Sequence, residues 1–240
     1  MISQDQIREN LDEVAERITR AAARAGRSVA DIRLVVVTKA HSIEIVRSAI
    51  GAGARILGEN YADEGLEKIR AIGNIPGIEW HMIGHVQSRK APDVALNYSL
   101  IHSVDSYKLA EKINRVATIA LARQDILLQI NVSGEESKYG IPCWNDDQFN
   151  ELTAETRRIA DLPNVKVCGF MTIPPLSEQA DSVRPFFQRL RKIRDQLARE
   201  IKNMDFVELS MGMSADFEIA VEEGATLVRV GTAILGERTA

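Results

Sequence analysis

The sequence has 240 residues, a length that suits one large domain, since a single (β/α)8 barrel commonly takes roughly 200 to 250 residues. It is 45% hydrophobic and 27% charged with a formal net charge of −4, which is typical of a globular protein and argues against a general nucleic-acid binder. No segment approaches the roughly 20 apolar residues of a membrane helix, and acidic residues interrupt the N-terminal region where a secretion signal would be apolar, so we expect a cytoplasmic protein without a membrane role.

Helical periodicity comes first in the chain, over residues 3–25, and a series of short apolar runs follows it. These runs are rich in Val, Ile and Leu, and they alternate with longer segments whose apolar residues recur at helical spacing. Strands are predicted at residues 33–39, 55–58, 79–83, 100–104, 126–132, 165–171, 206–209 and 227–230. Helices are predicted at residues 42–52, 62–72, 107–122, 148–161, 178–202 and 215–223.

Eight strands with intervening helices predict an α/β fold, a single (β/α)8 TIM barrel with an additional N-terminal helix. An open flavodoxin-like sheet is the alternative, but such a sheet has fewer strands and seldom begins with a whole helix. No linker rich in Pro, Gly and Ser and no shift in composition marks a second domain. Residues 1–240 are therefore expected to form one domain.

The active sites of such barrels lie at the C-terminal ends of the strands, so the polar residues that follow each apolar run are the candidates. Lys39 follows the apolar run 34–37, and its ammonium group would emerge from a buried strand into the mouth of the barrel. Desolvation there favours the neutral amine, which is the form that attacks a carbonyl group to make a Schiff base. The alternative is a lysine that extends to solvent at the rim or pairs with a carboxylate such as Glu59.

The last two loops have the composition of an anion site. Residues 210–214 read Ser-Met-Gly-Met-Ser, in which the glycine allows close approach of the backbone, and a helix is expected to begin near Ser214. Gly231 and Thr232 precede another short helical segment. TIM barrels frequently bind phosphate with the loops after strands seven and eight, which is where both segments fall. The alternative is that Ser214 only caps its helix and Gly231 only turns the chain.

Other polar residues within or near strands have structural as well as functional interpretations. Arg229 lies among apolar neighbours in the last predicted strand, so its guanidinium group needs a ligand or an ion-pair partner inside the barrel. His81 and His85 have i, i+4 spacing, but a strand that ends between them breaks the helical geometry that zinc would need, which leaves rim positions or a ligand pocket. Cys143 and Cys168 lie outside any C-x-x-C pattern, so neither a disulfide framework nor a metal site is predicted.

Six segments carry a resemblance to a known family. They are 36–39 (Val-Val-Thr-Lys), 58–61 (Gly-Glu-Asn-Tyr), 81–88 (His-Met-Ile-Gly-His-Val-Gln-Ser), 169–172 (Gly-Phe-Met-Thr), 209–214 (Leu-Ser-Met-Gly-Met-Ser) with Asp216, and 229–236 (Arg-Val-Gly-Thr-Ala-Ile-Leu-Gly). In this order they resemble the pyridoxal 5′-phosphate (PLP) homeostasis protein family, which is related to the N-terminal barrel of alanine racemase. One departure is the run 87–92, where the family often has Asn in place of Arg89 and no following proline.

The resemblance implies that PLP is the cofactor and that Lys39 holds it as an internal aldimine. It also implies that Arg229 faces the pyridine nitrogen. Because a guanidinium group does not give up a proton, it would leave that nitrogen unprotonated and weaken the cofactor as an electron sink. The resemblance further implies that Ser210, Ser214, Gly231 and Thr232 hold the phosphate and that Asn60, His81, Met211 and Met213 line the cofactor.

Three functions are compatible with these residues. The favoured one is PLP homeostasis, in which the protein binds and buffers PLP and delivers it to PLP-dependent apoenzymes, with no robust turnover of its own. Alanine racemases take a tyrosine base from a second domain of the partner subunit; that domain is not evident here, so a monomer is expected. The second function is a PLP-dependent amino-acid racemase with His85 or Tyr61 as its second acid. The third is a barrel that binds a sugar phosphate or nucleotide, with Lys39 paired to the phosphate.

Overall fold

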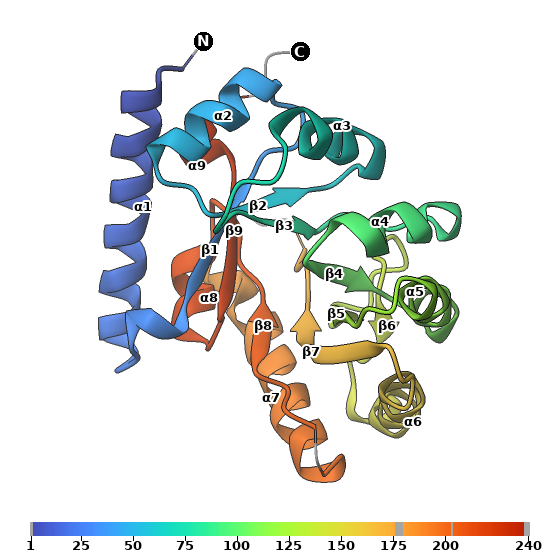
Figure 1. Ribbon diagram of the computed structural model, residues 1–240. Coiled ribbons are helices and arrows are strands. Elements are labelled where there is room, and N and C mark those ends of the chain that lie inside the picture. The colour runs from blue at the N-terminus through green and yellow to red at the C-terminus, as the bar shows by residue number, and fades with distance from the viewer. Residues whose placement is uncertain (1, 176–179, 203, 238–240) are drawn as a thin grey trace.

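The computed structural model describes residues 2–175, 180–202 and 204–237. Within these residues, eight parallel strands follow one another around a barrel in the order β4-β3-β2-β1-β9-β8-β7-β5, and pairing between β4 and β5 closes the ring (Figure 1). The predicted barrel with its N-terminal helix is confirmed. The barrel strands are β1 (Arg33–Val37), β2 (Ile56–Glu59), β3 (Glu79–Met82), β4 (Leu100–Val104), β5 (Gln124–Asn131), β7 (Val165–Met171), β8 (Glu208–Ser210) and β9 (Leu227–Val230), and β6 (Ile141–Pro142) pairs with the end of β5.

Helices follow the strands and cover the outside of the barrel (Figure 1). The α-helices are α1 (Gln4–Arg24), α2 (Ile43–Ala52), α3 (Ala62–Ile72), α4 (Ala91–Asn97), α5 (Tyr107–Ile119), α6 (Phe149–Ala160), α7 (Arg184–Glu200), α8 (Phe217–Glu222) and α9 (Thr232–Leu235). Short 3-10 turns are η1 (Val29–Asp31), η2 (Ser88–Lys90), η3 (Asp146–Gln148) and η4 (Ala180–Val183).

Some element boundaries differ from the prediction. The first strand ends at Val37, two residues early, because the chain turns at Thr38, whose carbonyl accepts the His41 N–H at 3.2 Å. The helix expected over 178–202 is η4 followed by α7, and positions 178 and 179 lie outside the described residues.

One helix, α4, was not predicted. It begins within the run 87–92 and has Pro92 in its first turn, where the missing N–H leaves no helical hydrogen bond unmade. The unusual proline of this run therefore starts a helix instead of disrupting one.

The strands divide their side chains between two apolar layers, because successive residues of a strand point to opposite faces. The larger layer lies between the sheet and the helices and includes Leu57, Ile101 and Phe170. The smaller one fills the barrel and consists of Val35, Ile56, Ile83, Leu100, Leu127, Cys168, Met171 and Leu227. By the same alternation, the polar residues His81, His102, Ser210 and Arg229 also belong to the interior.

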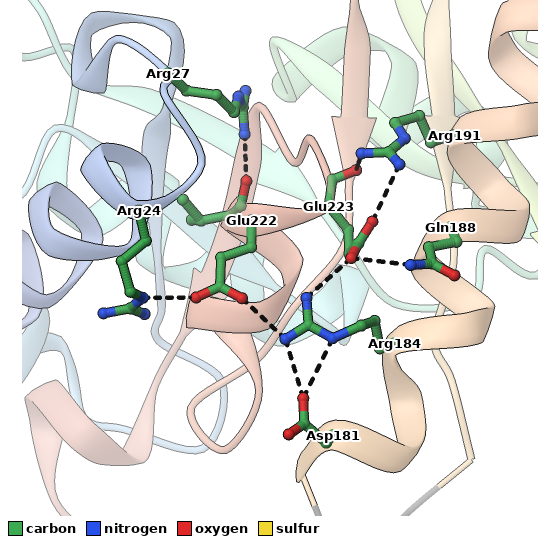
Figure 2. A network of polar contacts seen from close by, with 9 residues as sticks. Arg24, Arg27, Asp181, Arg184, Gln188, Arg191, Glu222 and Glu223 are labelled. Atoms are coloured by element: carbon green, nitrogen blue, oxygen red, sulfur yellow. Dashed lines mark hydrogen bonds and ion pairs between the residues drawn. The ribbon is translucent and has the colours of Figure 1, made fainter.

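The N-terminal helix α1 packs lengthwise against the outside of the barrel (Figure 1). Its buried residues Ile7, Val14, Ile18 and Ala21 are separated by seven, four and three positions, which places them on one face of the helix. Polar contacts hold its C-terminal end: Arg24 Nε donates to Glu222 Oε1 at 2.7 Å, and Arg27 donates to the Val221 carbonyl at 2.6 Å (Figure 2).

Glu222 and Glu223 extend this network from α8 to α7 (Figure 2). Arg184 donates to both carboxylates at 2.9 Å, and Arg191 pairs with Glu223 at 3.2 Å. Gln188 donates to the same Glu223 carboxylate at 3.1 Å. Glu223 is buried and accepts from three side chains of α7, so it is the central acceptor between α7 and α8.

Replacement of Glu223 by Gln is expected to lower the free energy of unfolding by about 1 to 3 kcal/mol, since it removes a buried charge that accepts charged hydrogen bonds. Urea denaturation followed by circular dichroism measures the change. The matched control is Glu16→Gln, which removes an exposed pair with Arg20 and should cost less than about 0.5 kcal/mol. Equal effects of the two substitutions would contradict the central role of Glu223.

Candidate functional site

A cavity of about 440 Å3 opens at the C-terminal ends of the strands. Its wall includes Val37 at the end of β1 and Ile83 directly after β3, so it occupies the mouth where TIM barrels place their active sites. The structure brings seven of the predicted site residues to this wall, namely Lys39, Asn60, Met213, Ser214, Arg229, Gly231 and Thr232.

Lys39 lies in the turn after β1 and is half-buried. A buried lysine of α3 holds this turn from behind, because Lys68 Nζ donates to the Thr38 carbonyl at 2.6 Å. Lys68 also donates to Glu64 Oε1 at 2.6 Å, and the same oxygen accepts the Ala40 N–H at 2.6 Å. Ala40 has a φ of +59°, which an alanine rarely adopts, so this hydrogen bond stabilises a strained position next to Lys39.

Glu59, the carboxylate that the sequence offered as a partner for Lys39, is fully buried and bonded elsewhere. Its Oε1 accepts from Lys68 at 2.8 Å and from the Thr38 hydroxyl at 2.6 Å. Burial raises the pKa of Glu59, and the neighbouring Lys68 opposes that rise. The site therefore has a second cation, Lys68, whose role is to fix the backbone on both sides of Lys39.

The loop after β8 packs tightly against α8. Gly212 has a φ of +91°, and a Cβ atom there would come within 2.5 Å of the Ala220 side chain, so the position requires glycine. The Met213 N–H donates to Asp216 Oδ1 at 2.5 Å. Burial raises the pKa of Asp216, while this hydrogen bond and Arg229 lower it. The Asp216 carboxylate thus fixes the loop that carries the cavity residue Met213.

The helix expected to begin near Ser214 begins at Phe217 instead, so Ser214 is not its cap. The Ser214 hydroxyl accepts the Gly231 N–H at 3.4 Å and joins the loops after β8 and β9. A Cβ atom at Gly231 would lie 3.2 Å from the Val37 side chain, so the absence of a side chain keeps this wall open. Thr232 is exposed at the same wall.

Arg229 contributes a guanidinium group to the cavity wall and is almost entirely buried. Its two terminal nitrogens donate to the Ser210 hydroxyl at 2.6 Å and to the Thr172 carbonyl at 3.0 Å. Burial lowers the pKa of Arg229 to about 10, and the nearby Asp216 carboxylate opposes this shift. The guanidinium group is therefore still a cation at neutral pH.

Three predicted site residues do not reach the cavity wall. Ser210 is fully buried below it, between Arg229 and His102. Met211 points the other way and packs in the layer between the sheet and the helices. His81 lies at the opposite mouth, where it lines a second cavity of about 410 Å3 with Glu79 and other residues from the N-terminal ends of the strands. Neither His81 nor Met211 lines the first cavity, so their expected contacts with a ligand there stay predictions.

The cavity fits the chemistry of PLP. Asn60 Oδ1 is buried with no hydrogen-bond partner among the described residues, so the wall holds an acceptor for a ligand hydroxyl group. Val37, Ile83 and Met213 supply apolar surface for an aromatic ring. A cation and two hydroxyl-bearing residues, Arg229, Ser214 and Thr232, complete the wall with groups that suit a phosphorylated ring.

The sequence interpretation missed Lys138, which lines the cavity and donates to the Pro174 carbonyl at 3.4 Å. It follows β5 by seven positions, and only the folding of the loop brings it back. Asn131 causes that fold, because its Oδ1 accepts the N–H groups of Ser133 and Gly134 and its amide donates to the Glu135 carbonyl. The polar end of β5 was a visible signal, but the length of the loop concealed Lys138.

The two residues proposed as a second acid, His85 and Tyr61, are not part of the cavity wall. His85 lies 3.3 Å from the Asp105 carboxylate and stacks on the ring of Tyr139 at a centroid distance of 3.9 Å. Tyr61 has 61% of its surface exposed. Within the described residues, no group of three or more His, Cys, Asp or Glu could hold a metal ion.

Comparisons with known proteins identify the class of this barrel. The family described as the alanine racemase N-terminal domain matches residues 2–239. Pyridoxal phosphate homeostasis proteins are similar over their full lengths: the protein from Aquifex aeolicus is 44% identical over 96% of this chain and 97% of that protein. The human protein is 40% identical over 94% of this chain and 84% of that protein. The chain therefore belongs to the pyridoxal phosphate homeostasis protein family.

Solved structures agree with this assignment. PipY of Synechococcus elongatus, solved with PLP bound, has a TM-score of 0.79 at 33% identity, with 93% of this chain and 100% of that chain covered. Alanine racemase of Clostridium difficile shares the fold, with a TM-score of 0.75 at 18% identity over 100% of this chain and 58% of that chain. No helix in the described part of the chain is long and apolar enough to span a membrane.

The Lys68 cluster gives a stability prediction. Lys68→Met should lower the free energy of unfolding by about 3 to 5 kcal/mol, because it leaves the buried Glu59 carboxylate without its cation. The double variant Lys68→Met/Glu59→Gln removes that carboxylate and should recover part of the loss. Lys108→Met on exposed α5 surface is the control. Chemical denaturation measures all three, and a double variant no more stable than Lys68→Met would contradict the explanation.

The buried histidines give a pH prediction. Burial is the main cause that lowers the pKa values of His81 and His102 from 6.5, so below about pH 6.5 the unfolded chain binds protons that the native protein does not. The contribution of these two histidines to the free energy of unfolding should therefore be fully present above this pH. It should fall as the pH decreases, by up to about 1.4 kcal/mol per pH unit for each histidine. His102→Gln should reduce this slope between about pH 7 and 5. Identical slopes for the variant and the wild type would contradict the prediction.

Proposed function

We propose that this protein binds PLP in the C-terminal cavity, with Lys39 as the covalent attachment point, and serves PLP homeostasis. The observation that carries the proposal is the convergence of Lys39, Asn60 and Arg229 on one cavity with the wall formed by Ser214 and Gly231. The names of the relatives and the PLP-bound structure of PipY support it. PLP supplies an aldehyde that condenses with a neutral lysine amine and releases water.

Each residue of the wall has a role in this proposal. Ser214, Gly231 and Thr232 bind the phosphate at the loops after β8 and β9. Asn60 supplies the free acceptor Oδ1 to the ligand. Arg229 presents a fixed cation to the ring nitrogen and keeps a proton off it, which disfavours chemistry that needs the ring as an electron sink. The roles therefore suit retention of PLP better than turnover of an amino acid.

We also propose that this protein works as a monomer in the cytoplasm and passes PLP to PLP-dependent apoenzymes. The free, buried thiols of Cys143 and Cys168 are compatible with a reducing compartment. Sedimentation analysis at micromolar concentration tests the monomer, and a concentration-independent dimer would contradict it.

Borohydride trapping tests the attachment. Purified protein incubated with PLP should acquire a near-visible absorption band, and reduction should fix one PLP per chain to Lys39, as found by peptide mass analysis. Lys39→Ala should lose the band and the trapped adduct. The matched control Lys108→Ala changes an exposed lysine of α5 and should retain both. Wild-type protein that neither develops the band nor traps PLP would overturn the proposal.

Chiral analysis separates a PLP carrier from a racemase. The PLP-loaded protein is incubated with single L-amino acids, and the D-enantiomer is measured over time. We expect no more product than the protein present. Sustained racemisation beyond that amount, abolished by Lys39→Ala, would show that the protein is an enzyme. Transfer is measured in parallel by the activity that the loaded protein restores to a PLP-dependent apoenzyme.

A further inference from the structure

The barrel interior contains a line of polar side chains that cross from strand to strand. His81 Nδ1 lies 3.0 Å from His102 Nε2, and His102 Nδ1 lies 2.8 Å from Ser210 Oγ. Ser210 Oγ in turn accepts from Arg229 at 2.6 Å. The four residues come from β3, β4, β8 and β9, and none exposes more than 4% of its surface. In a layer filled mainly by apolar side chains, such a line requires an explanation.

The two ends of this line reach different cavities. Arg229 lines the cavity at the C-terminal mouth, where Lys39 lies. At the other end, His81 Nε2 lies 3.3 Å from the Glu79 carboxylate, and both residues line the cavity at the N-terminal mouth. The hydrogen bonds therefore form one path through the barrel from Glu79 to Arg229.

Donor and acceptor chemistry fixes the direction of every bond in the path. Arginine only donates, so Ser210 Oγ accepts from Arg229 and its own proton is free to go to His102 Nδ1. His102 then carries its proton on Nε2 and donates to His81 Nδ1. His81 likewise carries its proton on Nε2 and donates to the carboxylate of Glu79, which can only accept.

The reverse direction fails at both ends. It would place an unprotonated His81 Nε2 against the Glu79 carboxylate. At the other end, Ser210 Oγ could accept from both Arg229 and His102, but the proton of this buried hydroxyl would then lose the acceptor that His102 Nδ1 provides. A proton added to His81 Nδ1 would point at the N–H of His102. Burial disfavours that charge, since it is the main cause that lowers the pKa of both rings. Two neutral rings of the same tautomer are the state that satisfies all four bonds.

We propose that His81, His102 and Ser210 form a one-directional hydrogen-bond chain that orients Arg229 in the PLP cavity, which makes both histidines positioning residues of the ligand site. The proposal rests on the function proposed above, in which Arg229 contacts PLP. By accepting the Ser210 proton, His102 keeps a lone pair of Ser210 directed at the guanidinium group. His81 and Glu79 then hold the tautomer that His102 needs.

The tautomers can be measured without PLP. In protein labelled with 15N-histidine, long-range proton–nitrogen spectra at neutral pH should show His81 and His102 both protonated on Nε2 and not on Nδ1. Ser210→Ala should move the Nδ1 signal of His102 much more than the signals of His85, which lies outside the chain. An Nδ1-protonated ring at either position in the wild type would overturn the chain.

The effect of the hydrogen-bond chain on the ligand site is tested with two substitutions of His102. His102→Phe fills a similar volume without an acceptor, so the Ser210 proton loses its partner and the dissociation constant for PLP should rise about tenfold. The absorption band of bound PLP and its pH profile should shift as well. His102→Gln offers an oxygen to Ser210 and an N–H to His81, so it should restore affinity to within about threefold of the wild type and keep the band. Thr156→Val is the control. It removes a buried hydroxyl group that has no hydrogen-bond partner among the described residues and that lies on α6, outside the hydrogen-bond chain.

Folding of each variant is checked by circular dichroism and thermal unfolding. If His102→Phe does not fold, Ser210→Ala takes its place with the same expected loss and the same shift of the band. Equal affinity and an unchanged band in whichever of these variants folds would overturn the positioning role. Wild-type protein that shows the expected tautomers but binds no PLP would instead refute the proposed function and leave the hydrogen-bond chain standing.

Discussion

The structure depends on a cation buried inside an apolar barrel. Removal of a guanidinium group from water is costly unless protein groups replace its hydration, and Arg229 receives that replacement from the Ser210 hydroxyl and the Thr172 carbonyl. Ser210 ends β8 and Thr172 directly follows β7, so solvation of the cation on β9 fixes the relative positions of three strands at the cavity. The charge that a ligand would meet is thus built into the closure of the barrel.

A second buried cation, Lys68, fixes the position of the backbone near Lys39. Lys68 is enclosed by the Thr38 carbonyl and by the carboxylates of Glu59 and Glu64, and these contacts hold the strained Ala40 in place. Lys39 therefore extends from a turn that is fixed on its far side. Because Lys68 already occupies the buried carboxylate Glu59, that acid is engaged before Lys39 meets any ligand.

The parts of this structure that follow from periodicity were predictable, and those that depend on register were not. The apolar runs gave all eight barrel strands, and the position of Lys39 after the first of them placed it at the correct mouth. Ser210 and Met211 are adjacent, yet one faces the interior and the other the helices, and a sequence does not say which parity a three-residue strand takes. Lys68 sits four positions from Glu64 on a helix, a spacing typical of exposed pairs, so nothing in the sequence marked it as buried.

His81 is a residue that the resemblance assigned to the ligand site and that does not line the cavity with Lys39. It stands in a well-matched segment and is the third of the four residues of β3, but its side chain points inward and lines the cavity at the N-terminal mouth. Its partner is His102 on the next strand, a residue that no motif singled out. In TIM barrels the N-terminal mouth is associated with stability and the C-terminal mouth with function. A directed hydrogen-bond chain joins the two here, so a change in charge at Glu79 would act on the orientation of Arg229 through two neutral rings and one hydroxyl group.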